Sequence, residues 1–262
     1  MIDEVAGNEV VGDQRGHVGI LTLNRPHVRN AMNTALRHRF WKLVAEFRDS
    51  DDIRVVLITG AGTRAFSAGG DLKERDSLSE EQFLAQRARS CSKALVHYPK
   101  PVIAAVNGDA LGGGLELALF CDFRIASEDA RFGCPEIKRG IFPGSGATSL
   151  LARLVGITRA KELIFTGKLV SAAEALEMGL VGEVVPASDL MERSMSLAEE
   201  IACNAPIALR QAKMVIEESI ALPTNLALRL EDEAWTRCLY SEDRKEGIRA
   251  FNEKRPPRFT GR

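Results

Sequence analysis

The sequence predicts an α/β protein that ends in a helical region. Its 262 residues, 45% of them hydrophobic, can bury the core of one large domain. In the first half, short apolar segments typical of buried strands alternate with helical patterns, and two of these segments lead directly into glycine-rich turns. From about residue 147 onward the patterns are helical. We therefore expect a core of residues 1–190 and a helical region of residues 191–262, packed together because no linker-like stretch separates them.

Composition and charge exclude several classes of protein. The net charge of −1 creates no global field that would attract nucleic acid or an acidic membrane surface. The first four residues, Met-Ile-Asp-Glu, lack the basic and apolar pattern of a signal peptide. No apolar run approaches the roughly 18 residues that a membrane span requires. We expect a cytoplasmic protein without a membrane or nucleic-acid partner.

Cysteine and histidine spacing argues against a metal site. The five cysteines include no Cys-x-x-Cys pair, and the four histidines show no His-Glu-x-x-His spacing. An odd number of widely spaced cysteines also argues against a disulfide framework. We expect reduced, mostly buried thiols and no metal.

The N-terminal part predicts a hairpin, a helix and a buried strand, in that order. Residues 9–11 and 17–23 read as two strands around turn residues, and residues 33–47 carry apolar side chains at helical spacing. The basic side chains of this helix, Arg37, Arg39 and Lys42, are interpreted as a solvated face, with RNA contact as the alternative. The apolar residues 53–59 are typical of a strand in a sheet covered on both faces.

Residues 60–65, Gly-Ala-Gly-Thr-Arg-Ala, match the glycine-rich dinucleotide fingerprint, with alanine at its last place. That fingerprint must lead straight into a crossover helix. Here a second glycine-containing loop, residues 66–71, follows instead, and no helical apolar pattern begins before Phe83. We therefore reject a nicotinamide cofactor.

The middle of the chain predicts one more helix and three more strands before the helical region. Residues 79–82 form a capping-box sequence, and apolar residues continue the helical pattern as far as Leu95. Pro99 and Pro101 end that helix. The expected strands are residues 102–106, 123–126 and 131–133, and the expected helices after them are residues 147–154, 160–165, 172–178, 190–202, 207–220, 226–239 and 246–253.

The glycine triplet of residues 112–114 opens a helix that carries Glu116 among apolar residues. Consecutive glycines cost backbone entropy, so the chain must turn sharply or approach something closely there. A buried carboxylate needs a partner or a function. Two interpretations stay open at this point: close packing with Glu116 in a salt bridge, or half of an active site at a helix N-terminus.

The two glycine-bearing turns and two glutamates in apolar surroundings have one common explanation. If the amides of Ala68 and Gly113 converge on one thioester oxygen, they would stabilise the negative charge that develops there. Two carboxyl groups beyond it, Glu116 and Glu136, could then exchange protons with water and with carbon.

Six motifs distributed along nearly the whole chain resemble the enoyl-CoA hydratase (crotonase) family. They are residues 23–26 with 30–33, residues 65–73, residues 107–108 with 111–117, residues 132–136, residues 142–144 and residues 246–255. The resemblance implies a spiral of ββα units with a helical C-terminal region that assembles trimers, often stacked as hexamers. It also implies an acyl-CoA substrate and no separate cofactor.

The resemblance assigns roles to individual residues. Glu116 would position or activate the water added at the β-carbon, and Glu136 would deliver the proton to the α-carbon, which predicts an enoyl-CoA hydratase. The oxyanion-hole amides would belong to Ala68 and Gly113. The remaining coenzyme A contacts implied by the resemblance are Gly69, Gly70 and Asp71, with Phe251 and Lys254 reaching in from the tail.

Several alternatives remain open from the sequence. Within the family, an isomerase or a specialised acyl-CoA hydratase would share these motifs. Leu115 and Cys134 flank the two glutamates and vary within the family, so the acyl chain is undetermined. Outside enzymes, a non-catalytic acyl-CoA-binding or RNA-binding protein is the remaining possibility.

Overall fold

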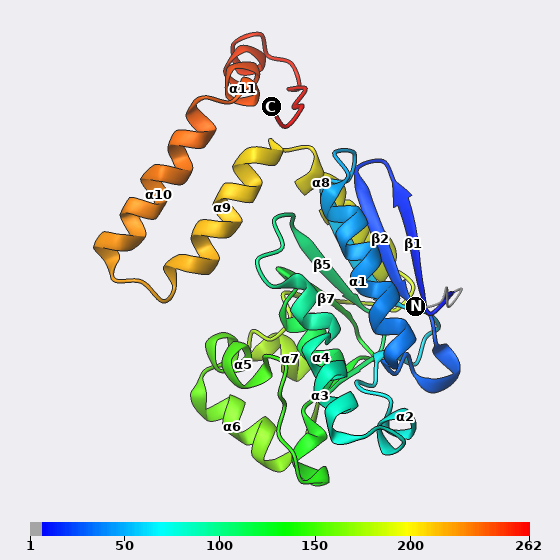
Figure 1. The fold of residues 1–262 in the computed structure, drawn as a ribbon. Coiled ribbons are helices and arrows are strands. Elements are labelled where there is room, and N and C mark those ends of the chain that lie inside the picture. Colours follow the sequence, from blue (N-terminus) through cyan, green and yellow to red (C-terminus); the bar gives the residue numbers. More distant parts are fainter. Residues whose placement is uncertain (1–6) are drawn as a thin grey trace.

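The structure, a computed structural model, describes residues 7–262 as two sheets, the helices that cover them and a projecting helical arm (Figure 1). The larger sheet has six strands in the order β1-β2-β3-β5-β7-β10, all parallel except for the antiparallel pair β1 and β2. These strands are β1 Val10–Arg15, β2 Val18–Leu23, β3 Val55–Gly60, β5 Val102–Val106, β7 Phe123–Ser127 and β10 Glu183–Val185.

The smaller sheet has four strands in the order β4-β6-β8-β9. They are β4 Ala65–Ser67, β6 Asp109–Leu111, β8 Arg131–Gly133 and β9 Leu169–Ser171. Three times in succession the chain makes a strand of the larger sheet, then a strand of the smaller one, then a helical segment. This repetition is the expected spiral of ββα units.

The helices are α1 Thr34–Asp49, α2 Leu72–Asp76, α3 Glu80–Ala88, α4 Gly113–Leu119, α5 Ala147–Val155, α6 Ile157–Thr166, α7 Ala172–Glu177, α8 Leu190–Ala202, α9 Pro206–Ser219, α10 Thr224–Leu239 and α11 Glu242–Asn252. Short 3-10 helices occupy Pro26–Val28, Cys91–Leu95 and Pro135–Arg139.

Helices cover both faces of the larger sheet, which explains its continuously apolar strands. Leu36 and Phe40 of α1 belong to the main hydrophobic cluster on one face, whereas Met195 and Ala198 of α8 pack with Ile103 in a second cluster on the other. Every residue of β3 and of β5 is buried. The two strands predicted as fully covered are therefore confirmed.

The helix predicted from residue 79 to Leu95 is divided into two segments. Its capping box is confirmed, because the Ser79 hydroxyl accepts from the Gln82 amide and the Gln82 side chain accepts from the Ser79 amide. However, α3 ends at Ala88 and the apolar residues beyond it form a separate 3-10 helix. The sequence analysis also missed α2, whose N-terminus is capped by Asp71.

The predicted boundary near residue 190 lies at the start of a helix that belongs to the core. Helix α8 packs on strands β2, β3, β5 and β7, so the chain leaves the core only after Ala202. Helices α9 and α10 pack on each other and project from the body, and α11 follows at their end (Figure 1). Lys213 of α9 pairs with Asp122 of the body at 2.8 Å.

Two absences apply to residues 7–262. No helix among them is both long and apolar enough to cross a bilayer. Within the same residues, no group of His, Cys, Asp and Glu side chains is arranged to hold a metal ion. All five thiols are free, and Cys91, Cys121 and Cys134 are buried.

Candidate functional site

The glycine triplet begins α4 and brings it against the smaller sheet. A methyl group on Gly114 would overlap the carbonyl oxygen of Ser67, and Gly112 has a φ of 54°, in the left-handed region. A methyl group on Gly112 would also lie 2.8 Å from Oε1 of Glu136. The triplet therefore serves close packing and, at the same place, brings a carboxyl group to the helix N-terminus.

Substitution of Gly114 by alanine is expected to destabilise the fold by about 1–3 kcal/mol, because α4 and β4 must move apart to accommodate the added methyl. Gly182→Ala is the matched control, since its methyl would lie 3.7 Å from the nearest atom. Denaturant unfolding of both variants measures the difference. Equal stabilities would show that the contact between α4 and Ser67 is not needed.

Glu116 is 4% exposed and lies in the first turn of α4. Its Oε1 accepts hydrogen bonds from the amides of Ser145, at 2.5 Å, and Ala147, at 3.4 Å. Burial raises the pKa of this carboxyl, and the hydrogen bonds from the two backbone amides oppose that shift. No lysine, arginine or histidine of residues 7–262 forms an ion pair with it, so the salt-bridge interpretation of Glu116 is wrong.

Glu136 follows β8 in the 3-10 helix Pro135–Arg139. Its Oε2 is buried without a hydrogen-bond partner in the described part of the chain. Burial raises the pKa of Glu136 to about 7, and the charge of Glu116 adds to that shift. Oε1 thus lies beside Gly112, while Oε2 can bind or release a proton without breaking a hydrogen bond within the described residues.

The backbone amides correct one predicted site residue. The amide of Ala68 donates to the carbonyl oxygen of Arg29 at 2.9 Å, so it has no proton to offer a substrate oxygen. The amides of Gly70 and Gly113 have no acceptor within residues 7–262. A methyl group on Gly113 would lie 3.7 Å from the Gly70 nitrogen, which places these two segments side by side. The free pair of donors is therefore Gly70 and Gly113.

A cavity of about 600 Å³ joins these groups. Its lining includes both glutamates and all of the predicted segment from Ala68 to Asp71. Asp71 is fixed there by an ion pair with Arg25 at 2.8 Å. The site residues predicted from distant parts of the sequence are thus brought together, with the donor moved from Ala68 to Gly70.

Phe251 and Lys254 do not line this cavity. Phe251 is 84% exposed on α11, and Lys254 lies just beyond the end of that helix. Their contact with coenzyme A stays a prediction.

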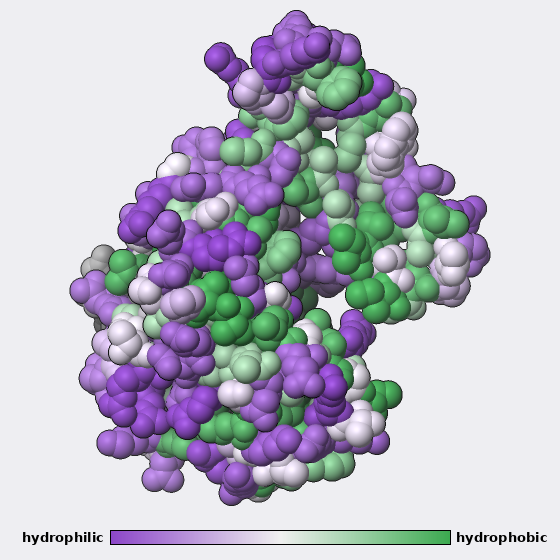
Figure 2. Space-filling model, turned by 180° about the vertical axis from the view of Figure 1, so that it is seen from behind, coloured by the Kyte–Doolittle hydropathy of each residue, from purple (hydrophilic) through white to green (hydrophobic). Residues whose placement is uncertain are grey.

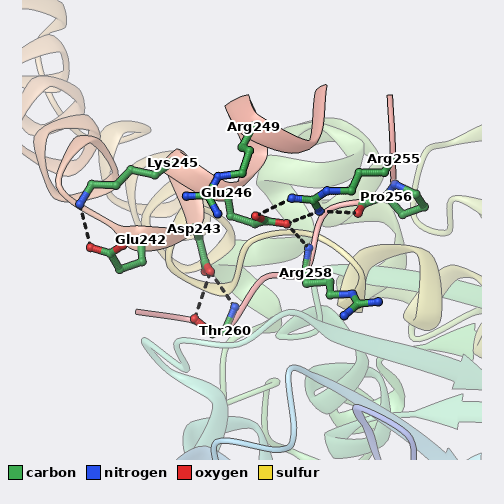
Figure 3. A pocket seen from close by; sticks show the side chains of 9 residues that line it. All are labelled: Glu242, Asp243, Lys245, Glu246, Arg249, Arg255, Pro256, Arg258 and Thr260. Atoms are coloured by element: carbon green, nitrogen blue, oxygen red, sulfur yellow. Dashed lines mark hydrogen bonds and ion pairs between the residues drawn. The ribbon is translucent and has the colours of Figure 1, made fainter. Parts of the chain in front are cut away.

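A second cavity, of about 640 Å³, lies between α11 and the C-terminal tail (Figure 3). Ion pairs join the side chains that line it. Arg255 pairs with Glu246 at 2.6 Å, and Lys245 pairs with Glu242 at 2.8 Å. Asp243 holds the tail by accepting from the amide of Thr260. None of the predicted catalytic residues lines it, and its charges are largely matched within the cavity.

Five arginines line the first cavity, Arg29, Arg37, Arg75, Arg87 and Arg139, and all were missed as site residues. Arg37 was interpreted as part of a solvated helix face, but it is only 9% exposed and lines the cavity together with Arg75 and Arg87. Its position beside the apolar Leu36 and Phe40 was a signal that the apolar stripe is wider on this side. The sequence did not show what it faces.

The glycine sequence at residues 60–65 connects β3 to β4 rather than to a helix. This confirms the structural reason for rejecting a dinucleotide fingerprint.

The sequence matches the enoyl-CoA hydratase/isomerase family over residues 13–262. The chain belongs to the enoyl-CoA hydratase/isomerase family. A short-chain-enoyl-CoA hydratase of Clostridium acetobutylicum is 41% identical over 250 residues, covering 95% of this chain and 96% of that protein. The 2,3-dehydroadipyl-CoA hydratase of Escherichia coli is 40% identical over 255 residues, covering 97% of this chain and 100% of that protein.

Among solved structures, the enoyl-CoA hydratase from Bacillus anthracis superimposes with a TM-score of 0.95 at 43% identity. The match covers 97% of this chain and 100% of that one. Sequence and fold therefore both identify the chain as an enzyme of the enoyl-CoA hydratase/isomerase family. An acyl-CoA substrate is consistent with that family.

Proposed function

We propose that this enzyme is an enoyl-CoA hydratase, which adds water reversibly across the double bond of a trans-2-enoyl-CoA to give a 3-hydroxyacyl-CoA. The observation that carries the proposal is the position of two carboxyl groups beside a pair of free backbone amides. The relatives named as hydratases at 40–41% identity support it.

In this mechanism the thioester oxygen accepts from the amides of Gly70 and Gly113. These donors are fixed by the fold, so they stabilise the enolate charge without reorganising during the reaction. Polarisation of the thioester makes the β-carbon electrophilic.

The two glutamates then divide the work. Glu116, held by two amides, takes a proton from water as the oxygen bonds to the β-carbon. Glu136 gives a proton to the α-carbon, and a pKa of about 7 means that a substantial fraction carries that proton at neutral pH. Water supplies all the atoms added, so the reaction requires no redox cofactor. Both carboxyl groups lie on the cavity that holds the double bond, consistent with syn addition.

An isomerase of the same family is the second candidate, because a single carboxyl group can move a proton between carbons. Two carboxyl groups at the site favour hydration over isomerisation. The test is to incubate the purified enzyme separately with crotonyl-CoA and with trans-3-hexenoyl-CoA and to identify products by mass. We expect 3-hydroxybutyryl-CoA from the first substrate. Conversion of the second to 2-hexenoyl-CoA without hydration of crotonyl-CoA would contradict the proposal.

We also propose that the enzyme assembles as a homotrimer or as a hexamer of two trimers. Hydrophobic residues gather on the projecting helices (Figure 2), among them Ile216, Trp235 and Phe251, which are exposed in the single chain. An exposed apolar surface of this kind favours association. Analytical ultracentrifugation measures the mass directly, and a monomer would contradict the assembly.

A further inference from the structure

The guanidinium of Arg37 is buried without a counter-ion. It is nine-tenths buried on α1, and its Nε has no hydrogen-bond partner within residues 7–262. No ion pair or hydrogen bond of the described chain reaches its other nitrogens. Burying an unpaired charge is costly, so a ligand that supplies an acceptor would be bound strongly.

Other cations surround Arg37 on the same cavity. Arg75 stacks over the ring of Phe83 at 4.0 Å, and Arg87 donates to the carbonyl of Gly144 at 3.1 Å. Burial lowers the pKa of Arg75, and the positive charges of Arg37, Arg139 and Arg87 lower it further, against the opposite effect of Glu136. These side chains therefore repel one another in the absence of an anion.

The acidic residues of the cavity do not neutralise this charge. Asp71 is paired with Arg25, Glu116 accepts from two backbone amides, and Glu136 is partly protonated at neutral pH. The cavity thus carries an excess of positive charge although the whole chain has a net charge of −1.

The arginines lie around the two carboxyl groups rather than in a separate part of the molecule. Arg87 and Arg37 favour the ionised form of Glu116, and Arg139 and Arg75 favour that of Glu136. A methyl group on Gly70 would lie 3.7 Å from Nη2 of Arg37, so this guanidinium is close to the proposed oxyanion donor. A ligand group that reaches Arg37 would belong to the substrate bound at that donor.

We propose that the acyl group of the substrate carries a distal carboxylate, which Arg37 binds with Arg75 and Arg87 beside it. The proposal rests on the hydratase function and names the class of its substrate, the 2-enoyl-CoA thioester of a dicarboxylic acid. A guanidinium binds a carboxylate through two parallel hydrogen bonds, which fixes the direction of the acyl chain as well as its charge. A neutral alkyl chain would leave Arg37 buried and unpaired.

Binding of saturated acyl-CoA thioesters tests this inference without requiring catalysis. Calorimetry compares glutaryl-CoA and adipyl-CoA with the neutral hexanoyl-CoA and heptanoyl-CoA. We expect at least one dicarboxylic thioester to bind about tenfold more tightly than its neutral counterpart, which is the usual contribution of a charged hydrogen bond. Equal or weaker binding of both dicarboxylic thioesters overturns the proposal.

Variants identify the residue responsible. Arg37→Met removes the charge and keeps much of the volume, and we expect it to abolish the preference while hexanoyl-CoA binding stays unchanged. Lys42→Met removes an exposed charge from the same helix outside the cavity and is expected to retain the preference. If Arg37→Met weakens all four thioesters equally, the guanidinium holds coenzyme A instead, and the proposal is wrong.

The two proposals fail separately. If neither crotonyl-CoA nor the 2-enoyl-CoA thioester of adipic acid is hydrated but the saturated dicarboxylic thioesters bind preferentially through Arg37, the hydratase assignment is wrong and the acyl specificity stands. If crotonyl-CoA is hydrated and no preference exists, only the specificity is wrong. If Arg37→Met does not fold, the inference is still tested by the wild-type protein, because its preference for dicarboxylic thioesters is measured without any variant. Arg87→Met then tests whether the neighbouring arginine contributes.

Discussion

Replacement of either Glu116 or Glu136 by glutamine is expected to lower kcat for hydration by about 10²- to 10⁴-fold, the usual contribution of a positioned general acid or base. Glutamine keeps the size and the hydrogen-bonding atoms of each side chain but cannot exchange the proton. Steady-state kinetics with the enoyl-CoA substrate measure the loss. Full activity in either variant would remove that residue from the mechanism.

The wild-type pH profile follows from the two carboxyl groups as a pair. Hydration moves one proton from Glu136 to the substrate while Glu116 receives one from water, so the pair carries a single proton before and after the reaction. Since the pKa of Glu136 is raised to about 7, kcat/KM is expected to fall above that pH, by up to tenfold per pH unit. Because the overall equilibrium involves no net proton, dehydration must show the same profile. A kcat/KM that does not fall above pH 7 would contradict the single-proton pair.

Stability provides the control for the Glu136 variant. The pKa of this carboxyl rises from its ordinary value of 4.5 to about 7 on folding, so the native state binds the proton more tightly than the unfolded state. The free energy of unfolding therefore falls as pH rises from about 4.5 to 7, and the penalty is complete above pH 7. Allowing for partial contact with solvent, Glu136→Gln should be more stable than wild type at pH 8 by about 1–3 kcal/mol. If Glu136→Gln is instead less stable than wild type, its loss of activity would be explained by unfolding and not by the missing carboxyl group.

Five of the six strands of the larger sheet were predictable because their signal is local, whereas the three-residue β10 was missed. Strands β3 and β5 are short apolar runs that end at glycine or asparagine, and helix α1 has a regular apolar stripe around Leu36 and Phe40. By contrast, the three-residue strands of the smaller sheet, such as β4 and β6, are too short to show a period. The order of strands depends on contacts between distant residues and was not predicted, and the spiral of ββα units came only through the family resemblance.

The errors occurred where tertiary contacts override sequence patterns. Helix α2 exists because Asp71 caps it while paired with Arg25, a contact between residues 46 positions apart. Arg37 has the sequence context of a solvated face, and only the packing of other segments over α1 buries it. The periodicity of α8 shows an apolar face without showing which partner covers it, so the sequence could not show that this helix packs on the larger sheet.

The choice between Ala68 and Gly70 shows the same limit at the site. Both are small residues in one loop, and sequence does not reveal where each amide points. The structure distinguishes them because the Ala68 amide donates to Arg29, whereas that of Gly70 has no acceptor in the described residues.

Gly70→Pro is therefore expected to lower kcat by about 10²- to 10³-fold, the cost of losing one oxyanion donor. Proline removes the N–H and places its ring where the oxygen would bind. The effect should appear in both kcat and KM, because the lost hydrogen bond strengthens as charge develops on the oxygen and the ring also displaces the bound substrate oxygen. Steady-state kinetics on folded protein, checked by thermal unfolding, measure it.

Gly70→Ala separates loss of the amide from any change in the loop. Its methyl would lie 3.7 Å from Nη2 of Arg37 and meet nothing closer, so alanine keeps both the N–H and the space around it. We expect this variant to retain kcat within a few-fold, since the donor is intact. If Gly70→Pro folds and keeps the wild-type kcat, the Gly70 amide is not the donor. The Ala68 amide would then have to release the Arg29 carbonyl when substrate binds, which would make this loop change conformation during the catalytic cycle.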